Sequence, residues 1–423
     1  MAHHKKTEMK SWEQAVLSPL HQQQRHAQQH RHPPHHRPAA ASAAPGAAPA
    51  GAAAPLPAAS PIPPLLSGLR ARYAALLTRL RGLQRAKEEL INWRASGYTE
   101  GYQLDFRVRR TLRGRGRVTA LGWSGDGFSL ATATADGRVV LWNANMERMR
   151  AVVTLPHEWP LALALEPARD ELLAVGGLSC SVTIFTQAEL LRRGGEGARP
   201  SAVLGGARSS ALGAGGHTSY ISAVRFPTPD RVATASGDGS LGVWDLTLNH
   251  RLHTLLPGGA AGPAGCLTCH PMDPDMLVAG SADGFLRVWD LRLPPAAACA
   301  LLLGGFHGAV NACDFFPSGM AVAGAGEDST VRLFDLRSAG AVGIYTEEAL
   351  GFAATGCAFS RSGALVFASY AGDGKCCVWE PLSADGVLHE LKGHAGTVSC
   401  LAVNSEGQAI ATGGYDSKVL VWA

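Results

Sequence analysis

Short apolar stretches recur along most of this chain, and each closes on an aromatic residue at a nearly constant spacing. From Trp244 onward the closing aromatics stand 45 residues apart, and the last follows after 43 residues. They are Trp244, Trp289, Phe334, Trp379 and Trp422. A period of this length is typical of stacked repeats, because each short unit needs a neighbour to bury its apolar faces. The pattern predicts β-rich units packed side by side.

An acidic residue stands six positions before each closing aromatic, which is the spacing of a WD repeat. These acids are Asp238, Asp283, Asp328, Asp373 and Asp416. Trp142 with Asp136 fits the same template, and Phe185 marks a degenerate second copy that lacks the acid. Seven copies result. We therefore expect an all-β fold, a closed β-propeller of seven four-stranded WD-repeat blades.

Two segments depart from the regular period within the expected propeller, which we assign to residues 96–423. The 59 residues between Phe185 and Trp244 exceed the period, so we expect a surface loop at about residues 192–215. The last repeat reaches Trp422 without an outer strand for its blade. We expect the alternating segment 105–112 to supply that strand and to close the ring.

WD repeats join a His, a Ser or Thr, the turn Asp and the closing Trp in one hydrogen-bonded chain, because buried polar groups require partners. The sequence predicts this structural tetrad whole in the third blade only, as His217, Ser236, Asp238 and Trp244. Blade four has no His, and blade seven has Gly414 where the hydroxyl is expected. We expect these incomplete blades to open more easily than blade three.

The first 64 residues are low in complexity and rich in His, Gln, Ala and Pro, so we expect them to be disordered. Residues 1–95 carry 13 Lys and Arg against 4 Asp and Glu, which places the basic charge at the N-terminal end. The nine Cys are scattered, and the sequence shows neither a secretory signal nor an apolar span of 18 residues. We expect an intracellular protein that does not cross a membrane.

Residues 65–95 carry a narrow apolar stripe at heptad spacing, which predicts a coiled-coil α-helix. The stripe contains Leu66, Leu69, Tyr73, Leu76, Leu80, Leu83 and Leu90. Such a helix could pack against its own propeller. We favour an obligate partner helix, because the ring of seven blades is complete without it and the stripe has the width of a two-stranded seam. The basic face of the helix suits an acidic partner or an anionic membrane.

Several motifs that could support catalysis or cofactor binding lack the context they need. Residues 266–270 match a haem-attachment pattern, but they fall inside a predicted strand of a chain without an export signal. Paired His residues in the N-terminal tail have no companion Cys or carboxylate to complete a metal site. The turn acids stand one per blade, too far apart for joint acid and base chemistry. We expect no enzymatic activity, no metal and no cofactor.

Several phrases of the sequence resemble the β subunit of heterotrimeric G proteins, over about residues 65–423. They include Arg-Arg-Thr-Leu-Arg-Gly at 109–114, Gly-His-Thr-Ser-Tyr-Ile-Ser at 216–222, Cys-Asp-Phe-Phe-Pro-Ser-Gly at 313–319 and Arg-Leu-Phe-Asp-Leu-Arg at 332–337. The final Lys-Val-Leu-Val-Trp and the Phe that closes the fifth blade are also similar to that family. The resemblance implies a non-catalytic subunit that pairs obligately with a γ subunit, binds the GDP-bound α subunit, and engages effectors after receptor activation.

The resemblance also implies interface residues at matched positions. The α-subunit and effector interface would contain Arg117, Val140, Trp159, Leu161, Leu178, Thr218, Tyr220, Asn311, Glu327 and Tyr415. The γ subunit would contact the apolar stripe of residues 65–95 together with Phe316 and Pro317. A large aromatic beside aliphatic and hydrogen-bonding neighbours is typical of a binding hot spot. Pro263, Gly265 and Ala309 replace acidic or Met residues of the family, which reduces charge complementarity at this interface.

Two further expectations follow from the resemblance. The chain would be cytoplasmic and peripheral at the inner face of the plasma membrane, held there through the lipid of its partner. No nucleic acid is implied. Rings of this kind also serve as generic scaffolds or as ubiquitin-ligase substrate receptors, and the repeats alone do not distinguish these classes. The heptad helix and the phrases in blades five and seven favour the G-protein interpretation.

Overall fold

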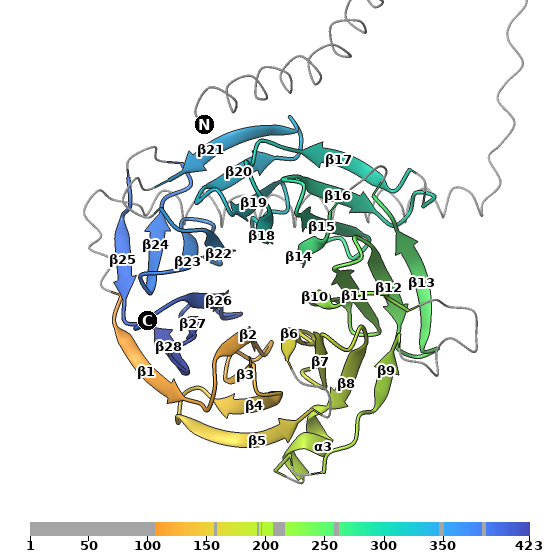
Figure 1. The fold of residues 1–423 in the computed structure, drawn as a ribbon, viewed down its shortest axis with the longest axis vertical. Helices are drawn as coiled ribbons and strands as arrows, with labels where there is room; N and C mark the ends of the chain where they lie inside the picture. The colour runs from red at the N-terminus through yellow and green to blue at the C-terminus, as the bar shows by residue number, and fades with distance from the viewer. Residues whose placement is uncertain are drawn as a thin grey trace, which may run out of the picture. The chain divides into compact units, whose positions relative to one another are not determined.

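A computed structural model describes residues 106–423, apart from 156–158, 193, 196, 206–215, 258–261, 296, 347–350 and 383–385. Within this part of the chain, seven antiparallel four-stranded sheets follow one another around a central axis (Figure 1). The innermost strand of each sheet packs against the innermost strand of the next. The prediction of a seven-bladed β-propeller is confirmed. The tail of residues 1–64 and the coiled-coil segment 65–95 lie outside the described residues.

The blades are numbered in chain order, and their strands are given from the innermost outward. Blade one contains β2 (Val118–Trp123), β3 (Ser129–Thr134), β4 (Arg138–Asn143) and β5 (Arg148–Thr154). Blade two contains β6 (Pro160–Leu165), β7 (Leu172–Gly177), β8 (Val182–Thr186) and β9 (Ala202–Leu204). Blade three contains β10 (Ile221–Thr228), β11 (Arg231–Ser236), β12 (Leu241–Asp245) and β13 (His250–Leu255).

The remaining blades repeat this plan. Blade four contains β14 (Ala264–Cys269), β15 (Met276–Ser281), β16 (Leu286–Asp290) and β17 (Cys299–Leu303). Blade five contains β18 (Val310–Phe315), β19 (Ala321–Gly326), β20 (Val331–Asp335) and β21 (Gly340–Tyr345). Blade six contains β22 (Ala354–Phe359), β23 (Val366–Tyr370), β24 (Lys375–Trp379) and β25 (His389–Lys392). Blade seven contains β26 (Val398–Val403), β27 (Ile410–Gly414), β28 (Lys418–Trp422) and, as its outer strand, β1 (Val108–Arg113).

The outer strand of blade seven comes from the opposite end of the described chain. β1 pairs antiparallel with β28, with Val108 opposite Trp422 and Arg113 opposite Lys418. Leu112 of β1 is only 1% exposed and packs in a core cluster that joins blades seven and one. Pairing the two ends removes an open edge from the last blade and closes the ring.

The hydrophobic core lies mainly between adjacent blades. One cluster joins blades three and four through residues such as Val243 and Leu267, and another joins blades four and five through Val288 and Phe315. Successive side chains of a strand point to opposite faces, so each inner strand contributes to the clusters on both sides of its blade. The ring is therefore the unit of stability, as expected for repeats that cannot bury their faces alone.

The region after Phe185 has more structure than predicted. The short helix α3 (Gln187–Arg192), whose Leu190 is buried, ends where the surface loop was expected to begin, and the expected loop at about residues 192–215 supplies β9, the outer strand of blade two. The backbone N–H of Val152 in β5 donates to the carbonyl of Gly194 at 3.0 Å. The insertion thus covers part of the edge of blade one. In the described part of the chain no helix is long and apolar enough to span a bilayer.

Candidate functional site

The expected α-subunit contacts lie mostly at one end of the propeller, which we call the rim. Every innermost strand starts at the rim, and because the strands are antiparallel, the turn between the second and third strands of each blade returns to it. Trp159 and Tyr220 directly precede β6 and β10, whereas Leu178 and Tyr415 directly follow β7 and β27. Residues distant in sequence therefore reach the same face of the ring.

The rim exposes large apolar side chains that a monomer would normally bury. Trp159 is 47% exposed, Leu178 is 53% exposed and Tyr415 is 47% exposed. The guanidinium carbon of Arg117 lies 5.5 Å from the centre of the Tyr415 ring, at the distance of a cation–π contact. Thr218 and Glu327 are also exposed, and Leu161 and Tyr220 are half-buried. This mixture of aromatic, aliphatic and charged groups has the composition of a protein-binding surface.

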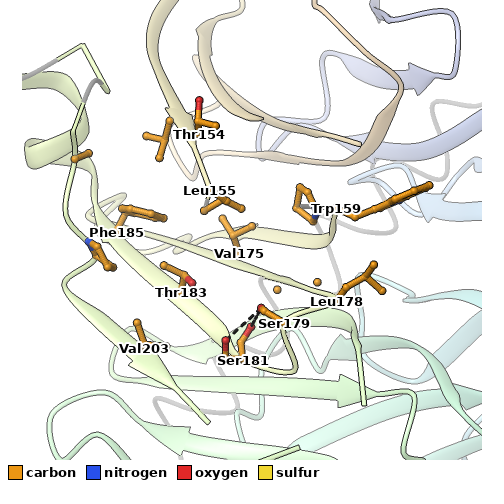
Figure 2. A pocket seen from close by; sticks show the side chains of 16 residues that line it. Thr154, Leu155, Trp159, Val175, Leu178, Ser179, Ser181, Thr183, Phe185 and Val203 are labelled. Atoms are coloured by element: carbon orange, nitrogen blue, oxygen red, sulfur yellow. Dashed lines mark hydrogen bonds between the residues drawn. The ribbon is translucent and has the colours of Figure 1, made fainter. Parts of the chain in front are cut away.

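Trp159 is held in an unusual backbone conformation. Its φ angle is +72°, in a region that a residue with a bulky side chain rarely adopts. The neighbouring Gly177 allows this arrangement, since a Cβ on Gly177 would lie 2.4 Å from the carbonyl oxygen of Trp159. The backbone N–H of Leu178 donates to the same oxygen at 3.4 Å. Trp159 and Leu178 consequently lie close together at one side of a pocket (Figure 2). Strain of this kind is typical of functional positions.

Two residues expected at the α-subunit interface, Val140 and Asn311, make contacts within the propeller. Val140 is only 6% exposed, because it lies on the third strand of blade one and packs in the core that this blade shares with blade seven. Its side chain is therefore part of the core between blades one and seven, and its assignment to the interface stays a prediction. The side-chain amide of Asn311 donates to the carbonyl of Ala354 in the next blade at 2.9 Å. Asn311 therefore joins two blades at the rim and has less freedom to reach a partner.

Asn311 belongs to a ring of residues that lie at β-bulges. In every blade the register shifts after the first pair of the two innermost strands, and one residue is left unpaired there. A bulge redirects the side chain of that residue. Five of the seven donate a hydrogen bond to a backbone carbonyl of the next blade, at 2.5 to 2.9 Å: Thr119, Ser222, Asn311, Thr355 and Ser399. Leu161 in blade two and Gly265 in blade four cannot donate such a bond, because neither has a polar side chain.

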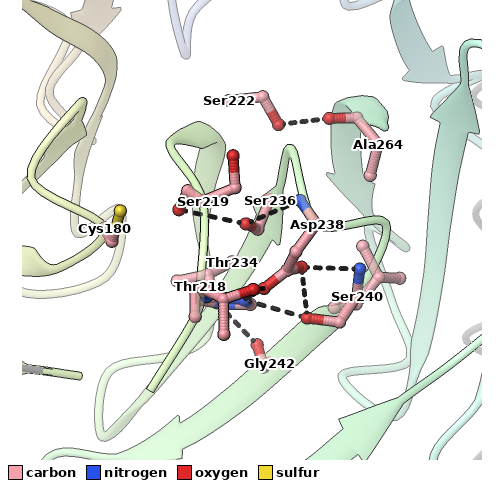
Figure 3. Close-up of polar contacts among 12 residues, drawn as sticks. Cys180, Thr218, Ser219, Ser222, Thr234, Ser236, Asp238, Ser240, Gly242 and Ala264 are labelled. Carbon is pink, nitrogen blue, oxygen red and sulfur yellow. Dashed lines mark hydrogen bonds and ion pairs between the residues drawn. The ribbon is translucent and has the colours of Figure 1, made fainter. Parts of the chain in front are cut away.

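The hydrogen-bonded tetrad of blade three is present, with one correction. Figure 3 shows Thr234, Ser236, Asp238 and Ser240 among the polar contacts of this blade. The indole N–H of Trp244 donates to the hydroxyl of Thr234 at 3.0 Å, and this hydroxyl lies 2.7 Å from Nε2 of His217. The Nδ1 atom of His217 lies 3.0 Å from the hydroxyl of Ser240 and 3.5 Å from Asp238 Oδ2. The predicted member Ser236 is wrong, since its hydroxyl donates to the carbonyl of Ser219.

Strand register explains why Thr234 and not Ser236 completes the tetrad. Thr234 lies opposite Gly242 on β12, whereas Ser236 lies at the rim end of β11. A Cβ on Gly242 would lie 2.8 Å from both the Thr234 hydroxyl and the Trp244 nitrogen. The glycine therefore leaves the space in which the indole of Trp244 reaches across to the hydroxyl.

Blade seven contains a second complete tetrad, contrary to the sequence prediction. The hydroxyl of Thr412 lies 2.9 Å from Nε2 of His394 and accepts the indole N–H of Trp422 at 2.9 Å. Nδ1 of His394 lies 3.0 Å from Asp416. The glycine in the supposed hydroxyl position is two residues beyond Thr412 and is required there, because a Cβ on Gly414 would lie 2.5 Å from His394 Nδ1.

Blade four is incomplete, as expected. Ala279 occupies the position of Thr234, and the indole nitrogen of Trp289 has no hydrogen-bond partner among the described residues. Arg287 takes over the contact with the turn acid and forms an ion pair with Asp283. Blade five uses the same replacement, with Arg332 paired to Asp328 at 3.4 Å.

The electrostatics of the blade-three tetrad favour a neutral histidine beside an ionised aspartate. Burial, together with the positive charge of Arg251, lowers the pKa of His217 from 6.5 to about 4. Burial opposes ionisation of Asp238, but hydrogen bonds from Ser240 and from the backbone of Thr218 outweigh it and lower the pKa of this carboxyl. The tetrad therefore has a structural role.

The expected γ contact in blade five lies at the end of the ring opposite the rim. Phe316 and Pro317 follow β18, and the Phe316 ring packs edge to face against Phe359 with ring centres 5.3 Å apart. Both residues are half-buried. The apolar stripe of residues 65–95 lies outside the described part of the chain. In that described part no group of three or more His, Cys, Asp or Glu is placed to hold a metal ion.

Comparison with known proteins gives a consistent result. A family profile described as "G protein beta WD-40 repeat protein" matches residues 85–423. The guanine nucleotide-binding protein subunit beta of Oryza sativa subsp. japonica is 32% identical over 329 residues, which cover 74% of this chain and 82% of the rice protein. The corresponding protein of Arabidopsis thaliana is 30% identical over 74% of this chain and 82% of its own length. The subunit beta-1 of Nicotiana tabacum is 29% identical over 81% of this chain and 92% of its own length.

Proposed function

This chain belongs to the G protein β-subunit family of WD-40 repeat proteins, and we propose that it acts as the non-catalytic β subunit of a heterotrimeric G protein. The observation that carries the proposal is the exposure of Trp159 and Leu178 beside one another on the rim. Exposed aromatic and aliphatic groups on a rigid scaffold are typical of the centre of a protein interface.

The proposed ligand of the rim is the GDP-bound α subunit. Trp159 and Leu178 would form the apolar centre of the contact, and Arg117, Thr218, Glu327 and Tyr415 would form its polar border. Effectors would use the same surface once an activated receptor has caused release of α. Because Pro263, Gly265 and Ala309 stand where the family has acidic or Met residues, we expect the apolar centre to carry most of the affinity and the border to affect the association rate.

Replacement of Trp159 by Ala tests the proposal directly. Affinity for a GDP-loaded α subunit should fall at least about tenfold, because truncation of a central aromatic anchor costs more than about 1.4 kcal/mol. Binding is measured by surface plasmon resonance with the chain purified as a complex with a γ subunit.

The matched control is Phe128→Ala, which removes an aromatic of similar exposure from the opposite end of the ring. Phe128 is 52% exposed and lies on the turn between β2 and β3. Its loss should leave α affinity unchanged. Equal losses for the two variants, or no loss for Trp159→Ala, would remove the rim assignment.

We also propose that a γ subunit pairs with residues 65–95 and contacts Phe316 and Pro317. The apolar heptad stripe supports this, because a leucine stripe at heptad spacing is typically buried against a second helix. Co-expression with a γ subunit should raise the soluble yield strongly, and Leu76→Glu with Leu83→Glu should abolish the gain. A soluble, monodisperse chain produced alone would contradict an obligate pair.

The proposed location is the cytoplasmic face of the plasma membrane. The basic N-terminal region would add electrostatic attraction to the lipid of the γ partner. Removing the lipidated cysteine of the γ subunit should move the complex into the soluble fraction. Retention in the membrane fraction after that change would contradict the proposed anchoring.

A further inference from the structure

Blade two borders a cavity of about 850 Å³ just below the rim, and the cavity is partly open to solvent. Its described walls come from the end of blade one, from β7 and β8, and from the segment that leads into β9 (Figure 2). The volume lies within the range of small-molecule sites, which span roughly 300 to 1,000 Å³.

The cavity occupies the place that the tetrad fills in blade three. The two blades share one register, so that Phe185 corresponds to Trp244, Val175 to Thr234 and Thr183 to Gly242. Ser179 stands six residues before Phe185, where blade three has Asp238. In blade three the turn acid, a serine and an imidazole fill this volume. Blade two has shorter side chains at the turn and a smaller ring at its closing position, and the space is left open.

The lining has a defined chemical character. Val153, Leu155, Val175 and Phe185 form apolar walls, and no Lys, Arg, Asp or Glu is among the lining residues described. Four hydroxyl-bearing residues also line the space: Thr154, Ser179, Ser181 and Thr183 (Figure 2). The Ser181 hydroxyl donates to the Ser179 hydroxyl at 3.2 Å, and the Ser179 hydroxyl donates to the backbone carbonyl of Ser181 at 3.3 Å. The hydroxyl of Thr183 has no hydrogen-bond partner among the described residues.

We infer that this cavity binds an uncharged, mainly apolar small molecule that carries one hydroxyl or carbonyl group. The apolar walls supply most of the binding free energy, since burial of apolar surface is the dominant favourable contribution. The hydroxyl of Thr183 supplies one directed hydrogen bond. A carboxylate or an ammonium group would find no counter-charge among the described lining residues and is disfavoured there.

A residue at the mouth of the cavity, Trp159, has a spectroscopic signal. Trp159 and Leu178 both line the cavity and are exposed at the rim. A bound molecule therefore changes the surroundings of the Trp159 indole. The inference rests on the cavity alone and holds whether or not an α subunit binds the rim.

Ligand-observed ¹⁹F NMR on the full-length chain, prepared as its complex with a γ subunit, tests the inference with 6-fluoro-2-naphthalenemethanol as the probe. The probe signal should broaden with saturable dependence on protein concentration. The charged analogue 6-fluoro-2-naphthoate should bind at least about tenfold more weakly. Ser181→Phe, which fills the cavity from the turn, should weaken binding of the alcohol by at least about tenfold. Thr183→Val, which removes only the hydroxyl, should weaken it roughly fivefold.

The control variant is Ser338→Phe, which adds the same ring at an exposed position of blade five. It should bind the probe as the wild type does. All variants should keep the wild-type melting curve by circular dichroism, and the Thr183→Val result stands if Ser181→Phe does not fold. Absence of saturable binding to the wild type, equal binding of the naphthoate, or unchanged binding to both cavity variants would overturn the inference.

Discussion

Blades two and three have the same four-stranded register but different interiors. In blade three a hydrogen-bonded chain runs from Trp244 through Thr234 to His217, and the blade is closely packed. In blade two Phe185, Val175 and Ser179 occupy the corresponding positions, and a cavity of about 850 Å³ remains. The rim residues Trp159 and Leu178 border that cavity. A single blade can thus give up the stabilising chemistry of the repeat, because its neighbours hold it in the ring, and the space gained becomes available for binding.

The other blades lie between these extremes. Blade seven repeats the chemistry of blade three, whereas blades four and five replace the histidine by Arg287 and Arg332. Each arginine pairs with the turn acid of its own blade and lies over an aromatic ring, at 5.8 Å from Phe285 and 5.2 Å from Phe306. The turn acid is therefore the common element, and its partner can be an imidazole or a guanidinium.

Removing one hydroxyl from each of blades two and three should give the largest difference between the two blades in lost free energy of unfolding. Thr234→Val leaves the indole N–H of Trp244 and a ring nitrogen of His217 buried without partners. We expect a loss of about 2 to 4 kcal/mol in the free energy of unfolding. Thr183→Val in blade two removes a hydroxyl without a described partner and should cost below about 0.5 kcal/mol.

Urea unfolding followed by tryptophan fluorescence checks this pair, with the chain bound to a γ subunit in every sample. The slope of free energy against urea should be the same for both variants and the wild type, so that the midpoints report stability. Similar losses for the two variants would show that the tetrad contributes no more than an isolated hydroxyl, and the contrast between the blades would not hold.

The architecture could be predicted from the sequence because it depends on spacing. The recurrence of closing aromatics and turn acids is a property of the chain order, and it determines the number of blades and the position of the missing outer strand. The tetrad hydroxyl could not be placed by the same reasoning, since Thr234 and Ser236 stand two residues apart on one strand and share a face. A usable signal exists: Thr132, Thr234 and Thr412 each stand ten residues before a closing Trp.

The rim was predicted less completely than the fold. Trp159 and Leu178 were found through family resemblance, and the structure exposes both. Val140 is buried on the third strand of its blade, and a matched position in sequence does not show this burial. The blade-two cavity had no signal beyond the missing turn acid, since a cavity depends on how several side chains fit together in three dimensions.

Acidification should weaken blade three more than blade two. The folded-state pKa of His217 is about 4, below its ordinary value of 6.5, so the unfolded chain takes up a proton at this residue while the folded chain does not. Stability is therefore fully present above pH 6.5 and is lost as the pH falls toward 4. The shift corresponds to about 3 kcal/mol at most. The described residues of blade two contain no histidine.

The measurement compares urea midpoints of the wild type and His217→Gln between pH 7 and pH 4.5. The variant should be less stable at pH 7, and the gap between the two proteins should narrow steadily as the pH falls. A gap that stays constant across this range would mean that His217 titrates alike in the folded and unfolded chains.

Removing a hydrogen bond that joins one blade to the next should give the smallest difference between blades two and three. Ser222 of blade three donates to the carbonyl of Ala264 in blade four at 2.6 Å, whereas the matching bulge residue of blade two is Leu161 and donates nothing to blade three. Ser222→Ala should cost about 1 kcal/mol, which is the typical net contribution of one neutral hydrogen bond. Hydrogen exchange of β14 amides should quicken by roughly fivefold, which is the factor that 1 kcal/mol represents.

Leu161→Ala serves as the comparison, because it removes packing at the matching bulge of blade two and no hydrogen bond. Unchanged β14 exchange in Ser222→Ala would show that close packing alone, and not the hydroxyl at the bulge, holds these two blades together.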